Sequence, residues 1–292
     1  MILLDGKKTA QEIRTELKTA IDKLKADGKK VPGLAEILVG TNPASKIYVN
    51  SKAKDCNEIG MKTVTEKRDA DTSEKELLEL IESYNNNKDF HGILVQLPLP
   101  KHIDEDKVIE AISPLKDVDG FHPMSVGKLV IGKETFRSCT PAGIQELLIR
   151  YNIDTKGKHV VVLGRSNIVG KPIANIMLQK KEHANSIVTI CHSATKDISS
   201  YTKQADILIA AIGRAKFVKA DMVKEGVVVV DVGINRIDDA TAKKGYRVVG
   251  DVDFDEVSKK ASYITPVPGG VGLMTRAMLL KNTYAAYLKY GE

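Results

Sequence analysis

The feature that most constrains the fold is a regular alternation of short apolar runs with helix-period patterns along the whole chain. In the first half, helix periods cover residues 9–27, 43–59, 74–87 and 104–112. The apolar runs between them are LAEILVG, KTVTE and HGILVQL, and the second half continues with KHVVVLG, SIVTICHS, ADILIAAIG, GVVVVDVGIN and ASYITPVPGG. Strands this apolar are typically covered on both faces, as in parallel sheets. The sequence therefore predicts an α/β protein with two parallel-sheet domains.

Local signals mark several helix ends. Ser73 followed by Glu76 is a capping-box signature, and Gly60 closes the helix before it. The stretch HPMSVGKLVIGKETFRSC is predicted to be irregular, and Thr140 and Pro141 are predicted as the N-cap and first turn of a linking helix. The last segment, GLMTRAMLLKNTYAAYLKY, is predicted as a helix with an apolar stripe.

Composition narrows the class of protein. A chain of 292 residues with 42% hydrophobic and 28% charged residues is typical of a soluble protein of about two domains. The amino-terminal apolar run is too short for a signal peptide, and no stretch approaches the roughly 20 apolar residues of a membrane span, so we expect a cytoplasmic protein without membrane contact.

The spacing of the cysteines and the distribution of charge exclude further classes of protein. The three cysteines, Cys56, Cys139 and Cys191, are far apart, which indicates neither a disulfide framework nor a zinc site. The net charge is +6, but the lysines are scattered and no basic patch is interleaved with aromatic residues. We therefore expect no nucleic-acid partner.

The segment VVLGRSNIVGKP predicts a strand, a turn and a helix that cradle phosphate. Gly164 and Gly170 flank Arg165 and Ser166, in place of the usual Gly-x-Gly-x-x-Gly. A fold that selects NAD places an acid at the end of the second strand, whereas here that strand ends in Cys-His-Ser at 191–193. Because a guanidinium binds phosphate in bidentate fashion, the sequence favours NADP. The alternative is that Arg165 is a solvated loop residue.

One lysine stands out in the first half. On the predicted helix 43–59, Tyr48 and Lys52 are four residues apart, and Cys56 and Ile59 continue the same stripe. Lys52 is therefore the one lysine on a face predicted to be buried, while the other lysines of this helix point to solvent. Either Lys52 extends its ammonium group to water, or desolvation eases the loss of its proton so that it exchanges protons in catalysis.

Three further stretches carry candidate site residues. HGILVQLPLP places Gln96 at the carboxyl end of a strand, where ligands of parallel sheets bind, although an ordinary amide at a strand exit is also possible. KDVDGFHP lacks the spacing of a calcium loop; a turn explains one of Asp117 and Asp119 and leaves the other to bind a polar substrate. PVPGGVG has three glycines that let backbone approach a ligand, although a plain connecting loop is also possible.

Five segments resemble, in matching order, those of the bifunctional methylenetetrahydrofolate dehydrogenase and methenyltetrahydrofolate cyclohydrolase family. They are ASKIYVNSKAKDCNEIG, GILVQLPLP, KDVDGFHP, GRSNIVGKP and YITPVPGGVG, and they span nearly the whole chain. The resemblance implies a folate-binding catalytic domain at 1–139, completed by the carboxyl-terminal helix 272–292. It also implies a Rossmann-like NADP-binding domain at 140–271, a folate cleft between the domains, a homodimer joined through the cofactor domains, and no metal.

The resemblance also assigns roles to individual residues. Tyr48 would stack on the folate, Lys52 would be the main catalytic residue, Gln96 would hold Lys52 in its working protonation state, and Asp119 would anchor the pterin. The folate site would be lined by the backbone of Val95, Gln96, Leu97, Pro268, Gly269, Gly270, Val271 and Gly272. The cofactor phosphates would bind Gly164, Arg165 and Ser166, the 2′-phosphate would also meet Ser193, and the nicotinamide would lie near Ile234 and Thr275.

The implied activity is oxidation of 5,10-methylenetetrahydrofolate with NADP, followed by hydrolysis of the methenyl product to 10-formyltetrahydrofolate. The alternatives are a dehydrogenase-only enzyme of the same fold and a non-catalytic protein that binds a nucleotide or nucleic acid. The chain departs from the family pattern at two positions. Leu273 replaces a proline, and Arg276 stands where a small or apolar residue is usual, so that Arg276 either reaches a phosphate or is exposed.

Overall fold

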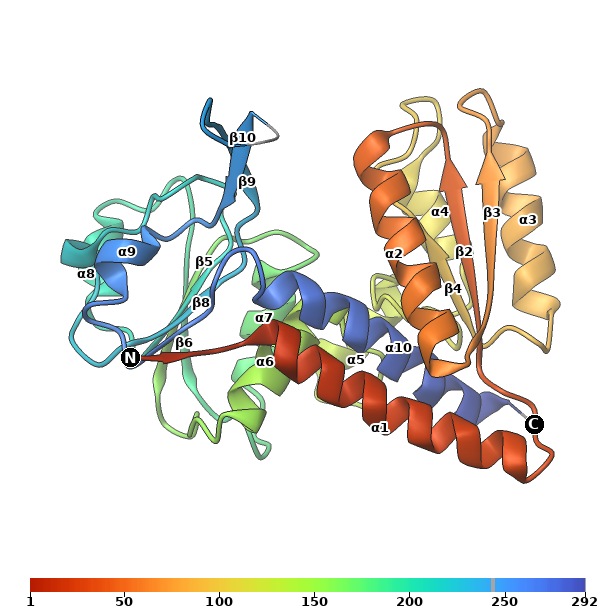
Figure 1. Cartoon of the computed structure of the whole chain (residues 1–292), viewed down its shortest axis with the longest axis horizontal. Helices are drawn as coiled ribbons and strands as arrows, with labels where there is room; N and C mark the ends of the chain where they lie inside the picture. The colour runs from red at the N-terminus through yellow and green to blue at the C-terminus, as the bar shows by residue number, and fades with distance from the viewer. Residues whose placement is uncertain (243–244, 292) are drawn as a thin grey trace. The chain divides into compact units, whose positions relative to one another are not determined.

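The computed structural model describes residues 1–242 and 245–291, which form two compact units (Figure 1). The six-stranded unit comprises Met1–Ala10 and Thr140–Thr275, and the three-stranded unit comprises Gln11–Cys139 and Arg276–Glu292. The boundaries fall inside two helices, α1 (Gly6–Ala26) and α10 (Val271–Tyr290).

The three-stranded unit is built on a parallel sheet in the order β3-β2-β4. These strands span Lys62–Arg68, Gly33–Val39 and Gly92–Val95. Ala35, Ile37 and Val39 of β2 lie in a core with α3 (Glu74–Asn86) and α4 (Glu105–Ala111). Successive strand residues face opposite sides, so Glu36 lies on the other face, against which α2 (Pro43–Ile59) packs.

The six-stranded unit has a parallel sheet in the order β1-β11-β8-β7-β5-β6. These strands are Ile2–Leu3, Tyr263–Ile264, Val228–Asp231, Ile207–Ala210, His159–Leu163 and Ile187–Cys191. One face is covered by α8 (Ile198–Thr202) and α9 (Phe254–Val257), while α7 (Gly170–Met177) packs on β5 and β6 (Figure 1). The chain passes from β5 to β6 and then returns to β7 on the other side of β5, and ligands of open α/β sheets bind beside the carboxyl ends of strands at such a reversal.

The prediction of two parallel α/β sheets is confirmed, since every pairing within both sheets is parallel. The capping box is also confirmed: the Glu76 amide donates to Ser73 Oγ at 3.2 Å, and the Ser73 amide donates to Glu76 Oε2 at 2.8 Å.

Four local predictions differ from the structure. The stretch predicted to be irregular contains a helix, α5 (Pro123–Val130), which the His122 ring caps by accepting from the Met124 amide at 2.9 Å. The linking helix α6 (Cys139–Arg150) begins one residue before the predicted N-cap, Thr140. An antiparallel hairpin, β9 (Asn235–Asp238) and β10 (Tyr246–Val249), was not predicted. The first ten residues group with the six-stranded unit rather than with residues 11–139, because β1 pairs with β11.

The capping box generates a stability prediction. Replacing Ser73→Ala removes the acceptor for the Glu76 amide, and we expect the free energy of unfolding to fall by about 1 kcal/mol in urea denaturation followed by circular dichroism. Ser83→Ala on the same helix is the control, because Ser83 is an exposed interior position where alanine is the better helix former. Equal losses in the two variants would contradict a specific role for the cap.

Candidate active site

Lys52 and Gln96 meet in the three-stranded unit. Lys52 lies on α2 and its Nζ donates a hydrogen bond to Gln96 Oε1 at 3.1 Å. Gln96 follows β4 directly; its backbone amide donates to the Ile37 carbonyl at 2.8 Å, and its Nε2 donates to the Leu97 carbonyl at 2.7 Å. Because the side-chain nitrogen of Gln96 is held by the Leu97 carbonyl, its side-chain oxygen, Oε1, faces Lys52. Sequence reasoning singled out both residues, and the structure brings them together.

The helix face around Lys52 is only partly as predicted. Cys56 and Ile59 are buried, Lys52 is half-buried, and Lys46 and Lys54 are exposed, as expected. Tyr48, however, is 42% exposed, so the prediction that it continues the buried stripe is wrong. Tyr48 lies one turn before Lys52 and next to Val49, which is fully buried, so the Tyr48 ring lies off the buried face of α2. An aromatic ring left open beside a half-buried lysine is able to stack on a planar ligand.

The two aspartates of KDVDGFHP have different environments. Asp117 accepts hydrogen bonds from the amides of Gly120, Phe121 and His122 at 3.0–3.1 Å and from Ser125 Oγ at 2.7 Å. Burial raises the pKa of Asp117 to about 6 despite these donors. Asp117 therefore holds the turn.

Asp119 is the second aspartate of this segment, and it does not accept the backbone amides of the turn that Asp117 binds. Burial raises its pKa, while the positive charge of Lys52 and a hydrogen bond with Cys139 act in the opposite direction. Asp119 thus belongs to the electrostatic surroundings of Lys52. The turn thus explains Asp117, as the sequence allowed for one of the two, and the binding of a polar substrate by Asp119 stays a prediction.

Glu36 is a group that sequence reasoning missed. Its side chain is fully buried on β2, and within the described part of the chain neither carboxyl oxygen has a hydrogen-bond partner. Burial raises the pKa of Glu36 to about 7, with Lys52 lowering it and Asp55 raising it further. The signal was available, because LAEILVG carries an acid inside an otherwise apolar run, and an unpartnered buried carboxyl group is rare enough to call for an explanation.

Arg276, at one departure from the family pattern, pairs with Asp55. Arg276 Nε donates to Asp55 Oδ2 at 2.6 Å, and its Nη2 donates to Asp55 Oδ1 at 2.5 Å and to the Ser51 carbonyl at 3.3 Å. The Arg276 side chain is 20% exposed and that of Asp55 only 4%. The expectation of an exposed arginine is wrong, and the guanidinium is directed to α2 instead of to a phosphate.

In the six-stranded unit, the turn from β5 to α7 packs closely against neighbouring backbone. A β-carbon on Gly164 would strike the Ala211 carbonyl beyond β7, and one on Gly170 would strike the Gly164 carbonyl. Ser166 Oγ accepts from the amides of Val169 and Gly170 at 3.2 and 3.3 Å, which holds the turn in place. Only glycine allows this close backbone packing, so the sequence GRSNIVG forms a compact loop at the sheet reversal.

Arg165 and Ser193 lie at the same edge of this sheet. Leu163 of β5 pairs with Cys191 of β6, and each of the two candidates follows two residues after its strand residue. Both are exposed. No carboxylate ends β6, so the edge offers a guanidinium and a hydroxyl to a phosphate ester, and these residues fit an NADP 2′-phosphate.

Two buried aspartates, also missed from the sequence, hold the neighbouring loops. Asp251 accepts from the amides of Ile212, Gly213 and Arg214 at 2.7–2.9 Å. Asp231, at the end of β8, accepts from the amides of residues 233, 251 and 252 at 2.9 Å. Burial raises the pKa of Asp231 to about 6. These bonds fix the loops that follow β7 and β8.

The segment Pro268–Gly272 ends the connection from β11 (Tyr263–Ile264) and includes the first two residues of α10. The Gly269 carbonyl accepts a hydrogen bond from the Lys7 amide at 3.0 Å. Gly6 and Gly270 pack so closely that a β-carbon on Gly6 would strike the carbonyl oxygen of Gly270. Gly269 and Gly270 therefore contact the start of α1, whereas Gly272 is exposed.

The two residues expected near the nicotinamide lie around this loop. Ile234 is 57% exposed, and its Cδ1 atom lies within van der Waals reach of a β-carbon added at Gly272. Thr275 shares a hydrogen bond of 2.8 Å with Thr140.

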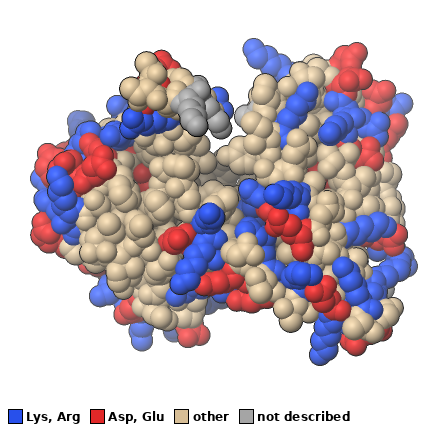
Figure 2. Space-filling model, in the orientation of Figure 1, with Lys and Arg blue, Asp and Glu red and all other residues tan. Residues whose placement is uncertain are grey.

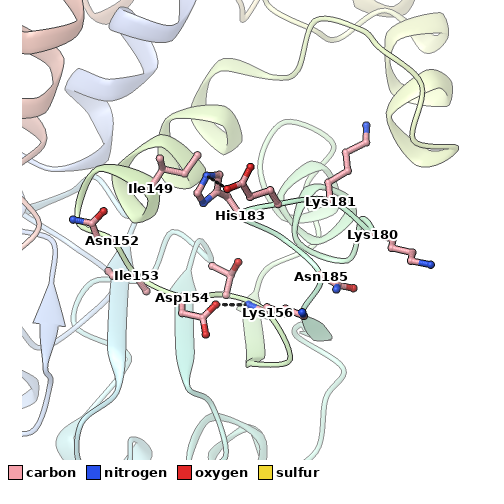
Figure 3. A pocket seen from close by; sticks show the side chains of 11 residues that line it. Ile149, Asn152, Ile153, Asp154, Lys156, Lys180, Lys181, His183 and Asn185 are labelled. Carbon is pink, nitrogen blue, oxygen red and sulfur yellow. Dashed lines mark hydrogen bonds and ion pairs between the residues drawn. The ribbon is translucent and has the colours of Figure 1, made fainter.

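A separate pocket of about 580 Å³ lies at the other edge of the six-stranded sheet (Figure 3). It is lined by residues that precede β5 and β6, among them Asn152, Asp154, Lys156, His183 and Asn185. These are the amino ends of the strands, whereas Gly164, Arg165 and Ser193 follow the carboxyl ends. The pocket is therefore distinct from the turn between β5 and α7.

Within residues 1–242 and 245–291, no cluster of three His, Cys, Asp or Glu side chains has an arrangement that could hold a metal ion. Among the helices of these residues, none combines the length and the apolar character that crossing a membrane requires.

Comparison with known proteins agrees with this geometry. Residues 4–119 match the family model of the tetrahydrofolate dehydrogenase/cyclohydrolase catalytic domain, and residues 138–290 match that of its NAD(P)-binding domain. The chain is 61% identical to the bifunctional protein FolD of Chloroherpeton thalassium, over 98% of each chain.

Solved structures agree as well. The bifunctional FolD enzyme of Campylobacter jejuni superposes with a TM-score of 0.93 at 52% identity, over 99% of each chain. A Trypanosoma brucei methylenetetrahydrofolate dehydrogenase-cyclohydrolase, complexed with NADP and an inhibitor, gives a TM-score of 0.93 at 36% identity over 99% of this chain and 98% of its own. The chain thus belongs to the tetrahydrofolate dehydrogenase/cyclohydrolase family.

Proposed function

We propose that this chain oxidises 5,10-methylenetetrahydrofolate with NADP and then hydrolyses the methenyl product to 10-formyltetrahydrofolate. The observation that carries the proposal is the Lys52–Gln96 hydrogen bond, set beside the buried carboxyl group of Glu36 and the half-buried carboxyl group of Asp119. Proton exchange is needed for the hydrolytic half of the reaction, and a half-buried lysine with a fixed polar partner is suited to it. A dehydrogenase-only enzyme of the same fold would lack this hydrolysis.

The proposed steps divide between the residues of the two units. NADP, when bound, accepts the hydride of the methylene bridge. Lys52 takes a proton from the water that attacks the methenyl carbon and returns one to the ring nitrogen that leaves. Gln96 orients the lysine, Asp119 anchors the pterin through hydrogen bonds, and Tyr48 stacks on the folate.

The same proposal extends to the remaining positions of the folate site. Val95 ends β4 and Gln96 and Leu97 follow it, while the segment Pro268–Gly272 comes after β11, so both stretches lie beyond the carboxyl ends of strands. Under this proposal the three-stranded unit is the folate-binding catalytic domain and the six-stranded unit is the cofactor domain.

NADP is the proposed cofactor. Gly164, Arg165 and Ser166 would bind its phosphates, Arg165 and Ser193 its 2′-phosphate, and Ile234 and Thr275 would lie near the nicotinamide. Support comes from the missing acid at the end of β6 and from the Trypanosoma brucei relative, whose structure contains NADP.

A nucleic-acid partner is not part of the proposal. Figure 2 shows Lys and Arg side chains interspersed with Asp and Glu on the face in view, so a phosphate backbone there would meet both signs of charge. A cytoplasmic location is part of it, supported by three cysteines that are all buried and unpaired, as in a reducing compartment.

A homodimer joined through the six-stranded units completes the proposal. β6 is an edge strand of the sheet, and its Ile187 and Ile190 are 63% and 40% exposed. An exposed apolar edge strand is a template for pairing with another chain. A second copy, presenting the same strand about a two-fold axis, would cover it.

Lys52→Gln separates the two activities. Hydride transfer moves no proton in the step itself, whereas hydrolysis does, so we expect the hydrolase rate to fall by at least about 10² and the dehydrogenase rate to fall less. Both rates are measured on one purified variant, with circular dichroism to confirm folding. Lys54→Gln, an exposed lysine of the same helix, is the control. Near-normal hydrolysis in Lys52→Gln would remove the lysine from the mechanism.

Arg165→Ala tests cofactor choice. Charge-assisted hydrogen bonds contribute roughly 1.5–3 kcal/mol, so the preference for NADP over NAD, measured as a ratio of kcat/KM values, should fall by about 10- to 100-fold. Lys180→Ala, exposed at the opposite edge of the sheet, should leave the ratio unchanged. A preserved preference in Arg165→Ala would mean that other groups read the 2′-phosphate.

Ile187→Lys tests the dimer. A charge on the exposed edge of β6 should prevent pairing there, so sedimentation velocity should show a dimer for the native chain and a monomer for the variant. Ile131→Lys is a matched exposed apolar position in the three-stranded unit and should remain dimeric. A dimer in both variants would place the interface elsewhere.

A further inference from the structure

The ion pair between Arg276 and Asp55 brackets the catalytic lysine proposed above. Asp55 follows Lys52 by three residues on α2, and Ser51, whose carbonyl accepts the third hydrogen bond of Arg276, immediately precedes it. All three bonds therefore act on the one helical turn that carries Lys52. The partner residue belongs to α10, which lies 221 positions along the chain from Asp55.

Stability alone is a weak explanation for this pair. Removing two charges from water costs energy that their attraction repays only in part, and well-packed apolar residues of similar volume are often as stabilising. The family pattern has a small or apolar residue at position 276, so the fold does not require an arginine there. What the pair adds is geometry, since a bidentate contact fixes direction as well as distance.

We propose that Arg276 is a positioning residue for Lys52: it fixes the turn of α2 that carries the lysine, and it cancels the charge of Asp55 beside it. This inference rests on the proposed catalytic role of Lys52.

The charged groups around Lys52 show why the charge of Asp55 has to be cancelled by Arg276. Glu36 approaches from β2, Asp119 and Cys139 from the loop and helix that follow β4, and Asp55 and Cys56 from α2 itself. Arg276 neutralises Asp55, which is the most buried of the acids on α2. Without that arginine an uncompensated negative charge would lie within one turn of the lysine.

Opposite single variants should therefore act in opposite directions. Arg276→Met leaves Asp55 unpaired, and the extra negative charge favours the neutral form of Glu36. The pH profile of methenyl hydrolysis should then move to higher pH, by on the order of one unit. Asp55→Asn leaves the arginine unpaired and should move the profile to lower pH by a similar amount. The double variant, Asp55→Asn with Arg276→Met, should lie close to the native profile.

A second readout does not depend on catalysis. The carboxyl band of Glu36 can be followed by infrared titration, with Glu36→Gln to assign it. Its midpoint should rise in Arg276→Met and fall in Asp55→Asn. Arg276→Lys keeps the charge but loses the bidentate contact, so it should keep the native pH profile while lowering kcat for hydrolysis more than it raises KM.

A purely structural pair would give a different pattern. Thermal unfolding would then be lowered in both single variants, with no shift or with shifts of the same sign in the pH profile and the Glu36 titration, and this result would overturn the proposal. If Lys52→Gln retains hydrolysis, the proposed role of the lysine is wrong, and the infrared titration still decides whether the pair sets the charge at Glu36. A variant that does not fold is replaced by Arg276→Lys, whose unchanged kcat would equally contradict the positioning role.

Discussion

The hydrogen bond from the Gln96 amide to the Ile37 carbonyl, 2.8 Å long, is the contact on which the catalytic geometry depends. It extends the ladder between β4 and β2 by one residue, so the glutamine leaves the sheet at a fixed point. The helix that follows β2 returns over the sheet, and this brings Lys52 to within 3.1 Å of the Gln96 oxygen. A one-residue change of register would turn Gln96 to the other face of the sheet and separate the pair.

The buried carboxyl groups divide into two kinds by their partners. Asp117 and Asp251 each accept three backbone amides, and Asp231 does the same at the end of β8, so each stabilises a loop in one conformation. Glu36 is as deeply buried, yet neither of its oxygens has a partner among the described residues. A carboxyl group buried without hydrogen bonds costs free energy in either protonation state, and the nearby charge of Lys52 offsets part of that cost for the ionised form. Glu36 is thus explained by the site and not by the fold.

The sequence was sufficient where the signal is local. Continuous apolar runs predicted β5, β7 and β8, and the Ser73 capping box predicted the start of α3, because strand burial and helix caps depend on adjacent residues. Helix α5 was missed because its eight residues include Gly127 and show too few turns for a period. The placement of β1 was missed because its two residues pair with a strand more than 250 positions away, and such a pairing leaves no trace in a short window. Among the site residues, Lys52 and Gln96 were found from helix and strand position. The exposure of Tyr48, next to the fully buried Val49, was not found, because it depends on which side of α2 packs against the rest of the unit.

Arg276 shows most clearly why the other features of the site could not be predicted from the sequence. The departure from the family pattern was visible, but its meaning depends on Asp55, and no property of either residue's neighbours in sequence connects them. The structure gives the reason that the two belong together. An arginine at 276 without an acid at 55 would bury a cation beside Lys52, and an aspartate at 55 without the arginine would bury an anion beside Glu36; either costs several kcal/mol when left unpaired. A chain with an apolar residue at 276 therefore needs an uncharged residue at 55, and the two positions are constrained as one unit even though 221 residues separate them.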